Sequence, residues 1–213
     1  KDVAELLLAH KAGVNTRDTI GHTPLHDAAA NGYTDAAELL LAHNAVVDAR
    51  DSDGNTPLLA AVAYDHKDVA ELLLAYKADL NAREKYGYSP LYVAASKGFK
   101  DVVELLLAHK AEVDARDNIG YTPLHAAASQ GYKDVAELLL AHNADVNARG
   151  NDGYTPLLMA AAFKGDRNMA ELLLAHKADV NARGKNGETA LRLEAGLGNK
   201  DVAEFLRQHG GRE

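Results

Sequence analysis

Residues 122–149, with the sequence TPLHAAASQGYKDVAELLLAHNADVNAR, form the stretch that decides the fold, because it recurs along the whole chain. Its opening residues return at steps of 33, 33, 33, 33 and 34, at Thr23, Thr56, Ser89, Thr122, Thr155 and Thr189. A Glu-Leu-Leu-Leu marker keeps the same period at Glu5, Glu38, Glu71, Glu104, Glu137 and Glu171, and ends as Glu204-Phe205-Leu206. Such a period predicts stacked repeats. The units are 18–50, 51–83, 84–116, 117–149 and 150–183, with a half unit at 1–17 and a last unit at 184–213.

Each unit predicts two short helices followed by a tip. Thr or Ser is a favourable N-cap, and the Pro after it suits the first helical position. A left-handed Gly then ends the Ala-rich first helix, at Gly32, Gly98, Gly131, Gly165 and Gly198. The second helix opens with pairs such as Lys133-Asp134, and the Glu three residues after the Asp resembles half of a capping box. Gly with Asn or Asp after the second helix predicts a tight hairpin turn.

The Leu triplets predict stacking, because one unit cannot bury its own triplet and neighbouring units together can. Some units depart from the pattern. Asp65 stands where the turn requires Gly, and one extra residue near Lys164 predicts a bulged turn. Gly150 and Gly184 replace the acidic residue found in the units before them. Ala190 replaces the Pro, and the polar ending at 207–213 predicts a C-terminal cap.

The segments TPLHAAA, GYKDVAELLL and ADVNAR together resemble the ankyrin repeat, and the resemblance covers essentially all 213 residues. It implies an all-α solenoid of stacked helix-turn-helix units with β-hairpin-like tips. It also implies that the tips and first helices form a concave face, which usually binds another protein. In this family the His after Pro-Leu, here His26 and His125, hydrogen-bonds the turn.

Composition excludes several classes of function. The net charge of −8 argues against a nucleic-acid binder, which needs a basic face. The chain has no Cys and no apolar run of the roughly 18 residues that a membrane helix needs, and we expect no signal peptide. No phosphate-binding loop, G-x-S-x-G or H-E-x-x-H motif occurs, so we expect no enzyme activity, cofactor or membrane contact. A cytoplasmic location fits these features, and secretion as an effector stays open.

The periodic polar residues predict structural roles. Five His (His10, His43, His109, His142 and His176) share one repeat position with Tyr76, and such positions lie about 10 Å apart, too far for one metal ion. The repeated Glu share one environment, which does not suit a catalytic pair. Arg17, Arg50, Arg83 and Arg116 precede acidic residues, which predicts a solvated charge ladder. Asn or Asp is expected to tie neighbouring units at Asn15, Asp48, Asn81, Asp114, Asn147 and Asn181.

The residues that vary between units predict the binding site. Tip and outward first-helix positions give the expected protein-binding residues Ile20, His22, Asp53, Asn55, Tyr64, Lys85, Tyr86, Tyr88, Lys97, Ile119, Tyr121, Gln130, Asp152, Tyr154 and Phe163. Their aromatic and Ile members should form a nearly continuous stripe, since Tyr is a favoured interface anchor. The expected anchors are Tyr86, Tyr88, Ile119 and Tyr121. Outward positions also include Ala126, Ser129 and Met159.

Other interpretations remain open. Tyr88, Tyr121 and Tyr154 share one repeat position, so each ring could instead pack on the neighbouring hairpin. Three aromatic residues directly follow the Gly that ends a first helix, and we expect them to be structural: Tyr33, Phe99 and Tyr132. The leading hypothesis is a monomeric protein-binding scaffold. One alternative is a designed or consensus-derived stable scaffold without a partner, and another is a targeting or small-ligand sensor part of a larger protein. A third is end-to-end association through residues 1–10, because this segment is expected to be the second helix of a unit whose first helix is absent.

Overall fold

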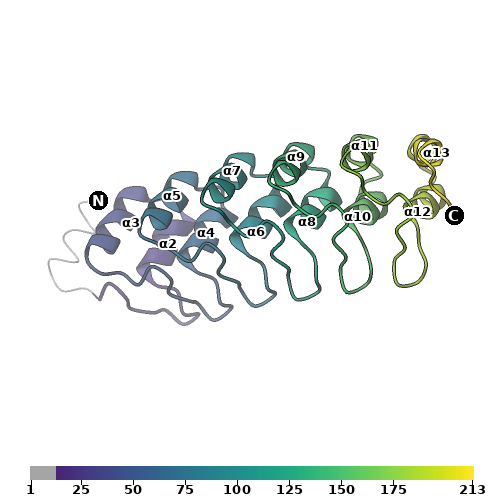
Figure 1. The fold of residues 1–213 in the computed structure, drawn as a ribbon. Helices are drawn as coiled ribbons and strands as arrows, with labels where there is room; N and C mark the ends of the chain where they lie inside the picture. Colours follow the sequence, from purple (N-terminus) through teal and green to yellow (C-terminus); the bar gives the residue numbers. More distant parts are fainter. Residues whose placement is uncertain (1–12) are drawn as a thin grey trace.

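The computed structural model describes residues 13–213, so the expected N-terminal helix at 1–10 and its association surface lie outside the described residues. The described part contains twelve helices in two layers (Figure 1). The first helices of the units are α2 (Pro24–Ala30), α4 (Pro57–Ala63), α6 (Pro90–Lys97), α8 (Pro123–Gln130), α10 (Pro156–Phe163) and α12 (Ala190–Leu197). The second helices are α3 (Thr34–Ala42), α5 (Lys67–Ala75), α7 (Lys100–Ala108), α9 (Lys133–Ala141), α11 (Arg167–Ala175) and α13 (Lys200–Gln208).

The first helices begin as the sequence predicts. The hydroxyl of Thr56 accepts from the N–H of Leu59 at 3.3 Å, and Pro57 occupies the first helical position. In α8, the imidazole Nδ1 of His125 accepts from the N–H of Thr122 at 3.1 Å. Its Nε2 therefore carries the proton, and lies 3.1 Å from the carbonyl oxygen of Tyr154 in the next unit. The His thus caps its own helix and also bonds the next tip.

The second helices begin differently from the prediction. Tyr132 is the N-cap of α9, and neither Asp134 nor Glu137 forms the expected half capping box. With Tyr132 as the N-cap, Glu137 is the fifth residue of the helix and not the third, the position that a capping-box acid occupies, so the prediction was wrong here. A His side chain caps the C-terminal end of most second helices. Its Nδ1 lies 2.8–3.0 Å from the carbonyl oxygen of the residue four positions earlier, and the residues concerned are His43, His109, His142, His176 and His209. These described His are structural, and His10 lies outside the described residues.

The core runs along the array between the two helix layers. Each first helix packs against its neighbours in the row and against its own second helix, as α8 does with α6, α10 and α9. Leu106, Leu124 and Leu139 are fully buried there. The prediction that Ala126, Ser129 and Met159 face outward was wrong, because they are only 4%, 8% and 7% exposed. The small side chains of α8 and α10 let the two helices approach closely and cover these positions.

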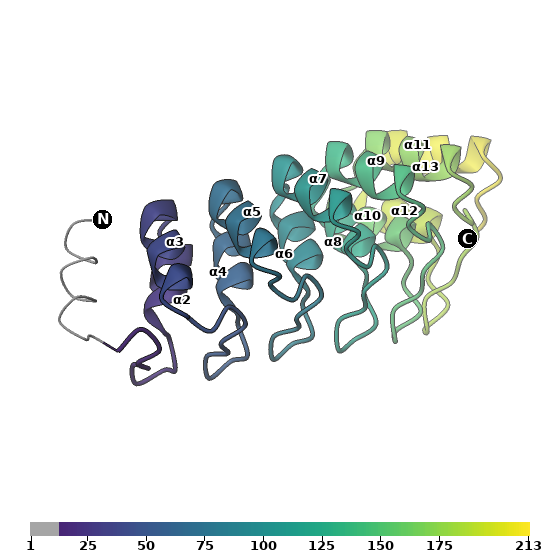
Figure 2. The ribbon, with the colours of Figure 1, turned by 60° about the vertical axis from the view of Figure 1, so that its left-hand side comes forward.

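The tips form one row below the helices (Figure 2). In the tip of unit 51–83, the N–H of Asp51 donates to the carbonyl of Asn55 at 3.0 Å, and its Oδ1 accepts from the N–H groups of Asp53 and Asn55. Consecutive tips are also joined, since the N–H of Asn118 donates to the carbonyl of Tyr86 at 3.0 Å. The tips described here are hydrogen-bonded turns without assigned strands. The row is therefore tied together through its backbone.

The Asn and Asp ties are confirmed. Asn81 Oδ1 accepts from the N–H of Glu112 at 3.0 Å, and Asn147 Oδ1 accepts from the N–H of Asp179 at 2.7 Å. Equivalent bonds, also to the unit that follows, occur at Asn15, Asp48, Asp114 and Asn181.

The predicted ladder of paired charges was wrong. Each Arg instead donates to the backbone carbonyl of the Arg one unit further on, as Arg50 does to Arg83 at 2.8 Å. The acidic residue beside each Arg accepts backbone N–H groups inside its own tip, as Asp18 and Glu84 do. The guanidinium groups therefore connect the units through backbone acceptors.

The C-terminal unit is capped over one layer. The tail takes the place of a following unit, since the N–H of Arg212 donates to Asn181 and the hydroxyl of Thr189 donates to the carbonyl of Arg212. The second helix α13 is polar on its outer side. The first helix α12, however, leaves Leu197 58% exposed beside an open hollow of about 420 Å³. The polar outer side of α13 fits the expected cap, whereas α12 leaves an apolar side chain open to solvent.

The two irregular inter-helix turns follow the prediction. Asp65 adopts the left-handed conformation at φ 62°, and the extra residue in unit 150–183 leaves Lys164 between α10 and the left-handed Gly165 at φ 58°. Left-handed backbone costs Asp more than Gly.

Changing Asp65 to Gly should therefore raise the free energy of unfolding by about 0.5–1 kcal/mol. Thermal unfolding would show this as a higher midpoint. Asp68→Gly is the matched control: Asp68 is exposed within the first turn of α5, where Gly should destabilise the chain by about 1 kcal/mol. Equal midpoints for the Asp65 variant and the original chain would contradict the strain argument.

Candidate protein-binding surface

The face formed by the tips and first helices, here called the tip face, carries the predicted binding residues in two rows. One row lies on the tips, where Ile20, Tyr86 and Ile119 are 51%, 58% and 54% exposed. The other lies where the first helices end, with Tyr64 and Phe163 at 63% and 66% exposed. A first helix of eight residues, about 12 Å long, separates the rows. The predicted binding residues therefore form two rows joined by smaller side chains.

The remaining predicted residues divide between the same two rows. Asp53 and Lys85 are exposed at the tips, and Lys97 and Gln130 are exposed at the ends of α6 and α8. The others are only partly exposed at the tips or their bases: His22, Asn55, Tyr88, Tyr121, Asp152 and Tyr154.

Stacked rings connect the tips to the first helices. Tyr88 stacks on Tyr92 at 4.5 Å between ring centroids, and Tyr121 stacks on His125 at 5.1 Å. His22 stacks on His26 in the same way at 5.5 Å. The first ring of each pair follows the tip glycine, and the second lies four residues later in the helix. Each stack therefore fixes a tip side chain against its own unit.

Tyr121 and Tyr154 also pack on the next tip. A Cβ added to Gly150 would lie 2.3 Å from the ring of Tyr121, and one added to Gly184 would lie 2.9 Å from the ring of Tyr154. These glycines stand where earlier units carry an acid, so the loss of that side chain makes room for the rings. The hydroxyl of Tyr121 then donates to Asp152 Oδ2 at 2.5 Å.

Tyr88 has a different neighbour, because the next tip begins with Asp117. This carboxylate is 7% exposed, and its Oδ1 accepts from the N–H groups of Ile119 and Tyr121 at 2.9 and 2.8 Å. Its Oδ2 is buried without a hydrogen bond of good geometry. Burial is the larger cause that raises the pKa of Tyr88 and of Tyr92, and the negative charge of Asp117 is the second. The two rings therefore lie in a negative field.

Lys85 shows how this surface holds a cation. Its Nζ lies 3.2 Å from Asp53 Oδ1 and 5.8 Å from the ring centroid of Tyr86. The hydrogen bond to Asp53, with its charge, raises the pKa of Lys85. An ammonium group thus lies between a carboxylate and an aromatic ring, an arrangement that attracts cations.

The sequence reasoning missed two residues of this surface. Tyr92 occupies the position of His26 and His125, and its aromatic type at that position was the available signal. Asp117 gave no separate signal, because its role depends on the unit before it. Tyr33 was expected to be structural but is 62% exposed, whereas Tyr132 lies on Gly98 as expected and Phe99 packs against the core.

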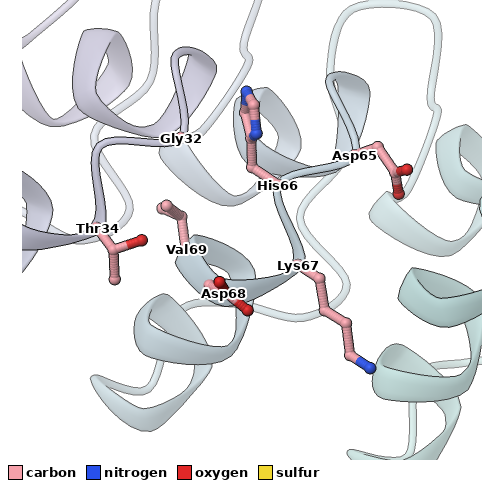
Figure 3. A pocket seen from close by; sticks show the side chains of 7 residues that line it. All are labelled: Gly32, Thr34, Asp65, His66, Lys67, Asp68 and Val69. Carbon is pink, nitrogen blue, oxygen red and sulfur yellow. The ribbon is translucent and has the colours of Figure 1, made fainter.

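The hollows between the inter-helix turns do not form an individual site. Figure 3 shows one of about 250 Å³, in which His66 points toward Gly32 and lies above Val69. The Nε2 of His66 is 3.1 Å from the carbonyl oxygen of Ala30 in the preceding unit. Equivalent hollows of about 310 and 400 Å³ recur beside Gly131 and Gly198. They follow from stacking, so they carry no chemistry specific to one unit.

The structure of residues 13–213 shows no group of three His, Cys, Asp or Glu side chains that could hold a metal ion. Each helix in the same part of the chain is too short or too polar to cross a bilayer.

Comparison with known proteins agrees with the architecture. A family model of three ankyrin repeat copies matches residues 1–84 and 76–150, and a model of many copies matches residues 143–193. A comparison with curated proteins finds no match. The repeat period, the paired helices, the row of tips and these family models agree, and the chain belongs to the ankyrin repeat family.

Proposed function

We propose that this chain is a non-enzymatic scaffold that binds a partner protein through its tip face. Ankyrin repeats are generally protein–protein interaction modules. The observation that carries the proposal is the pair of exposed anchors Tyr86 and Ile119, which lie on consecutive tips. The N–H of Asn118 bonds the carbonyl of Tyr86, and the N–H of Asn151 bonds that of Ile119 at 2.8 Å. The two exposed side chains are therefore presented by fixed backbone.

The mechanism is presentation by a preformed surface. Tip-to-tip bonds, Asn ties and Arg–carbonyl bonds hold the units in place before a partner arrives. A surface that is already ordered loses little conformational entropy when it binds. The exposed rings and Ile side chains supply apolar area, and Tyr adds a polar group at its edge. The partner would therefore meet a rigid row of anchors.

The double variant Tyr86→Ala/Ile119→Ala tests the proposal. Both side chains are more than half exposed, so the variant should fold normally. Truncated anchors cost roughly 1–2 kcal/mol each, so retention of the partner should fall more than about tenfold. The measurement is quantitative mass spectrometry of proteins retained from a lysate of the source cells, with circular dichroism to check folding.

The matched control is Tyr76→Ala/Val46→Ala. Tyr76 is the C-cap of α5 and Val46 lies in the connection after α3, and they are 43% and 53% exposed outside the two rows of predicted binding residues. The control removes one aromatic and one aliphatic side chain, as the test variant does. It should retain the partner fully. Equal retention by the test variant and the original chain, or equal loss by both variants, would contradict binding through the tip face.

A further inference from the structure

On the basis of the proposed function, we infer that the partner places an arginine side chain over the rings of Tyr86 and Tyr88, where unit 84–116 meets unit 117–149. The inference names the partner's chemistry at one boundary of the tip face. It combines three observations at this boundary, namely a run of aromatic rings, a buried carboxylate that lies against the last of these rings, and a lysine that already uses one ring as a cation site.

The rings form a continuous row from the tip to the first helix. Tyr86 and Tyr88 have centroids 6.0 Å apart, and Tyr88 stacks on Tyr92 at 4.5 Å with the planes 3° apart. Tyr86 is 58% exposed, whereas Tyr88 and Tyr92 are half-buried. The row therefore offers an open aromatic surface at the tip and an ordered one behind it.

The charge beneath the rings is negative. Asp117 Oδ2 is shielded from water and has no hydrogen bond of good geometry, so solvent screens its charge little. Glu84 adds a second carboxylate, which accepts the N–H groups of Tyr86 and Tyr88 at 2.8 and 3.0 Å. The nearby Arg116 is already engaged, because its Nη1 donates to the carbonyls of Gly120 and Arg149. A cation from outside would be attracted to this row.

The neighbouring boundaries lack this combination. At the next two, the acid is replaced by Gly150 and Gly184, and the rings of Tyr121 and Tyr154 cover those glycines. At the preceding boundary, Asn55 stands in place of the tyrosine. Among the described tips, the boundary after Tyr88 therefore joins a row of three tyrosine rings to an acid in the next unit.

Arginine fits this surface better than lysine does. A planar guanidinium stacks on an aromatic face and keeps donors free at its edge, whereas an ammonium acts as a compact point charge. Lys85 already places an ammonium near Tyr86 and is held there by Asp53. A flat group can share the remaining ring surface with it. The net charge of −8 favours the approach of a basic segment.

The test is a titration of the intact chain with acetyl-arginine methylamide, followed by NMR of the tyrosine rings. Acetyl-citrulline methylamide is the neutral comparison of nearly the same shape. We expect saturable shifts of the Tyr86 and Tyr88 signals with the arginine compound and at least threefold weaker binding with citrulline. Asp117→Asn, which keeps the Oδ1 acceptor, should weaken arginine binding at least threefold.

Asp18→Asn is the matched control. Asp18 accepts the N–H groups of Ile20 and His22, which are equivalent to the two that Asp117 accepts in its own tip, but Asp18 does not lie beside the tyrosine row. It should leave arginine binding unchanged. Equal shifts with arginine and citrulline, or equal binding by the Asp117 variant and the original chain, would overturn the inference. If arginine fails while protein capture still depends on Tyr86 and Ile119, the tip face binds a partner of other chemistry. If capture fails as well, the proposed function fails with it.

Discussion

Replacing Leu106 with Ala should lower the free energy of unfolding by about 3 kcal/mol. Leu106 is fully buried in α7, which packs against α6, α5 and α9. Neighbours on several sides hold the site open, so the cavity cannot collapse easily. Units of a solenoid contact only their neighbours, so a defect in the middle also weakens the coupling between the two halves. Urea unfolding followed by circular dichroism should show an earlier and broader transition.

Leu206→Ala is the matched comparison. Leu206 occupies the equivalent position in α13 and is equally buried, but α13 packs mainly against α11 and α12. Its loss should therefore loosen the last unit and leave the main transition close to that of the original chain. Hydrogen exchange should then be faster in α12 and α13 than in α7. Equal shifts of a single sharp transition in both variants would contradict nearest-neighbour coupling.

The features that the sequence predicted correctly are those that one unit determines locally. The N-caps of the first helices, the Pro at the first helical position and the left-handed turn at Asp65 depend on residues within a few positions of one another. The period then repeats the same evidence several times. The Asn and Asp ties were also predicted, because repetition at one polar position implies a common structural partner, here the N–H one unit further on.

The features that the sequence did not predict depend on contacts between units. Arg50 lies beside Asp51 in the sequence, but its partner is a carbonyl 33 residues away. Tyr88 and Tyr121 share one repeat position, yet one faces Asp117 and the other covers Gly150. Their environments differ because of the next unit. Which tyrosines are exposed could therefore be decided only once the stacking of units was known.

Acidification from pH 7 to pH 4 should destabilise the chain by about 3 kcal/mol through His125 alone. Burial lowers the pKa of His125 to about 4, against the hydrogen bond to the carbonyl of Tyr154, which raises it. In the unfolded chain the pKa is about 6.5. Between these values the unfolded state binds a proton that the folded state does not, so stability falls as the pH is lowered. Urea unfolding at a series of pH values measures the slope.

The variant His125→Leu isolates this contribution, because the chain itself carries Leu59 and Leu158 at the equivalent positions of α4 and α10. At pH 7 the variant loses the cap and the bond to Tyr154, which should lower its stability by about 1–2 kcal/mol. It has no imidazole to protonate at this position, so its stability should fall less as the pH is lowered. Because the original chain loses about 3 kcal/mol through His125 by pH 4, which exceeds this deficit, the two stability curves should cross between pH 7 and pH 4. A difference that stays constant with pH would show that another group, such as the buried His26, controls the acid transition.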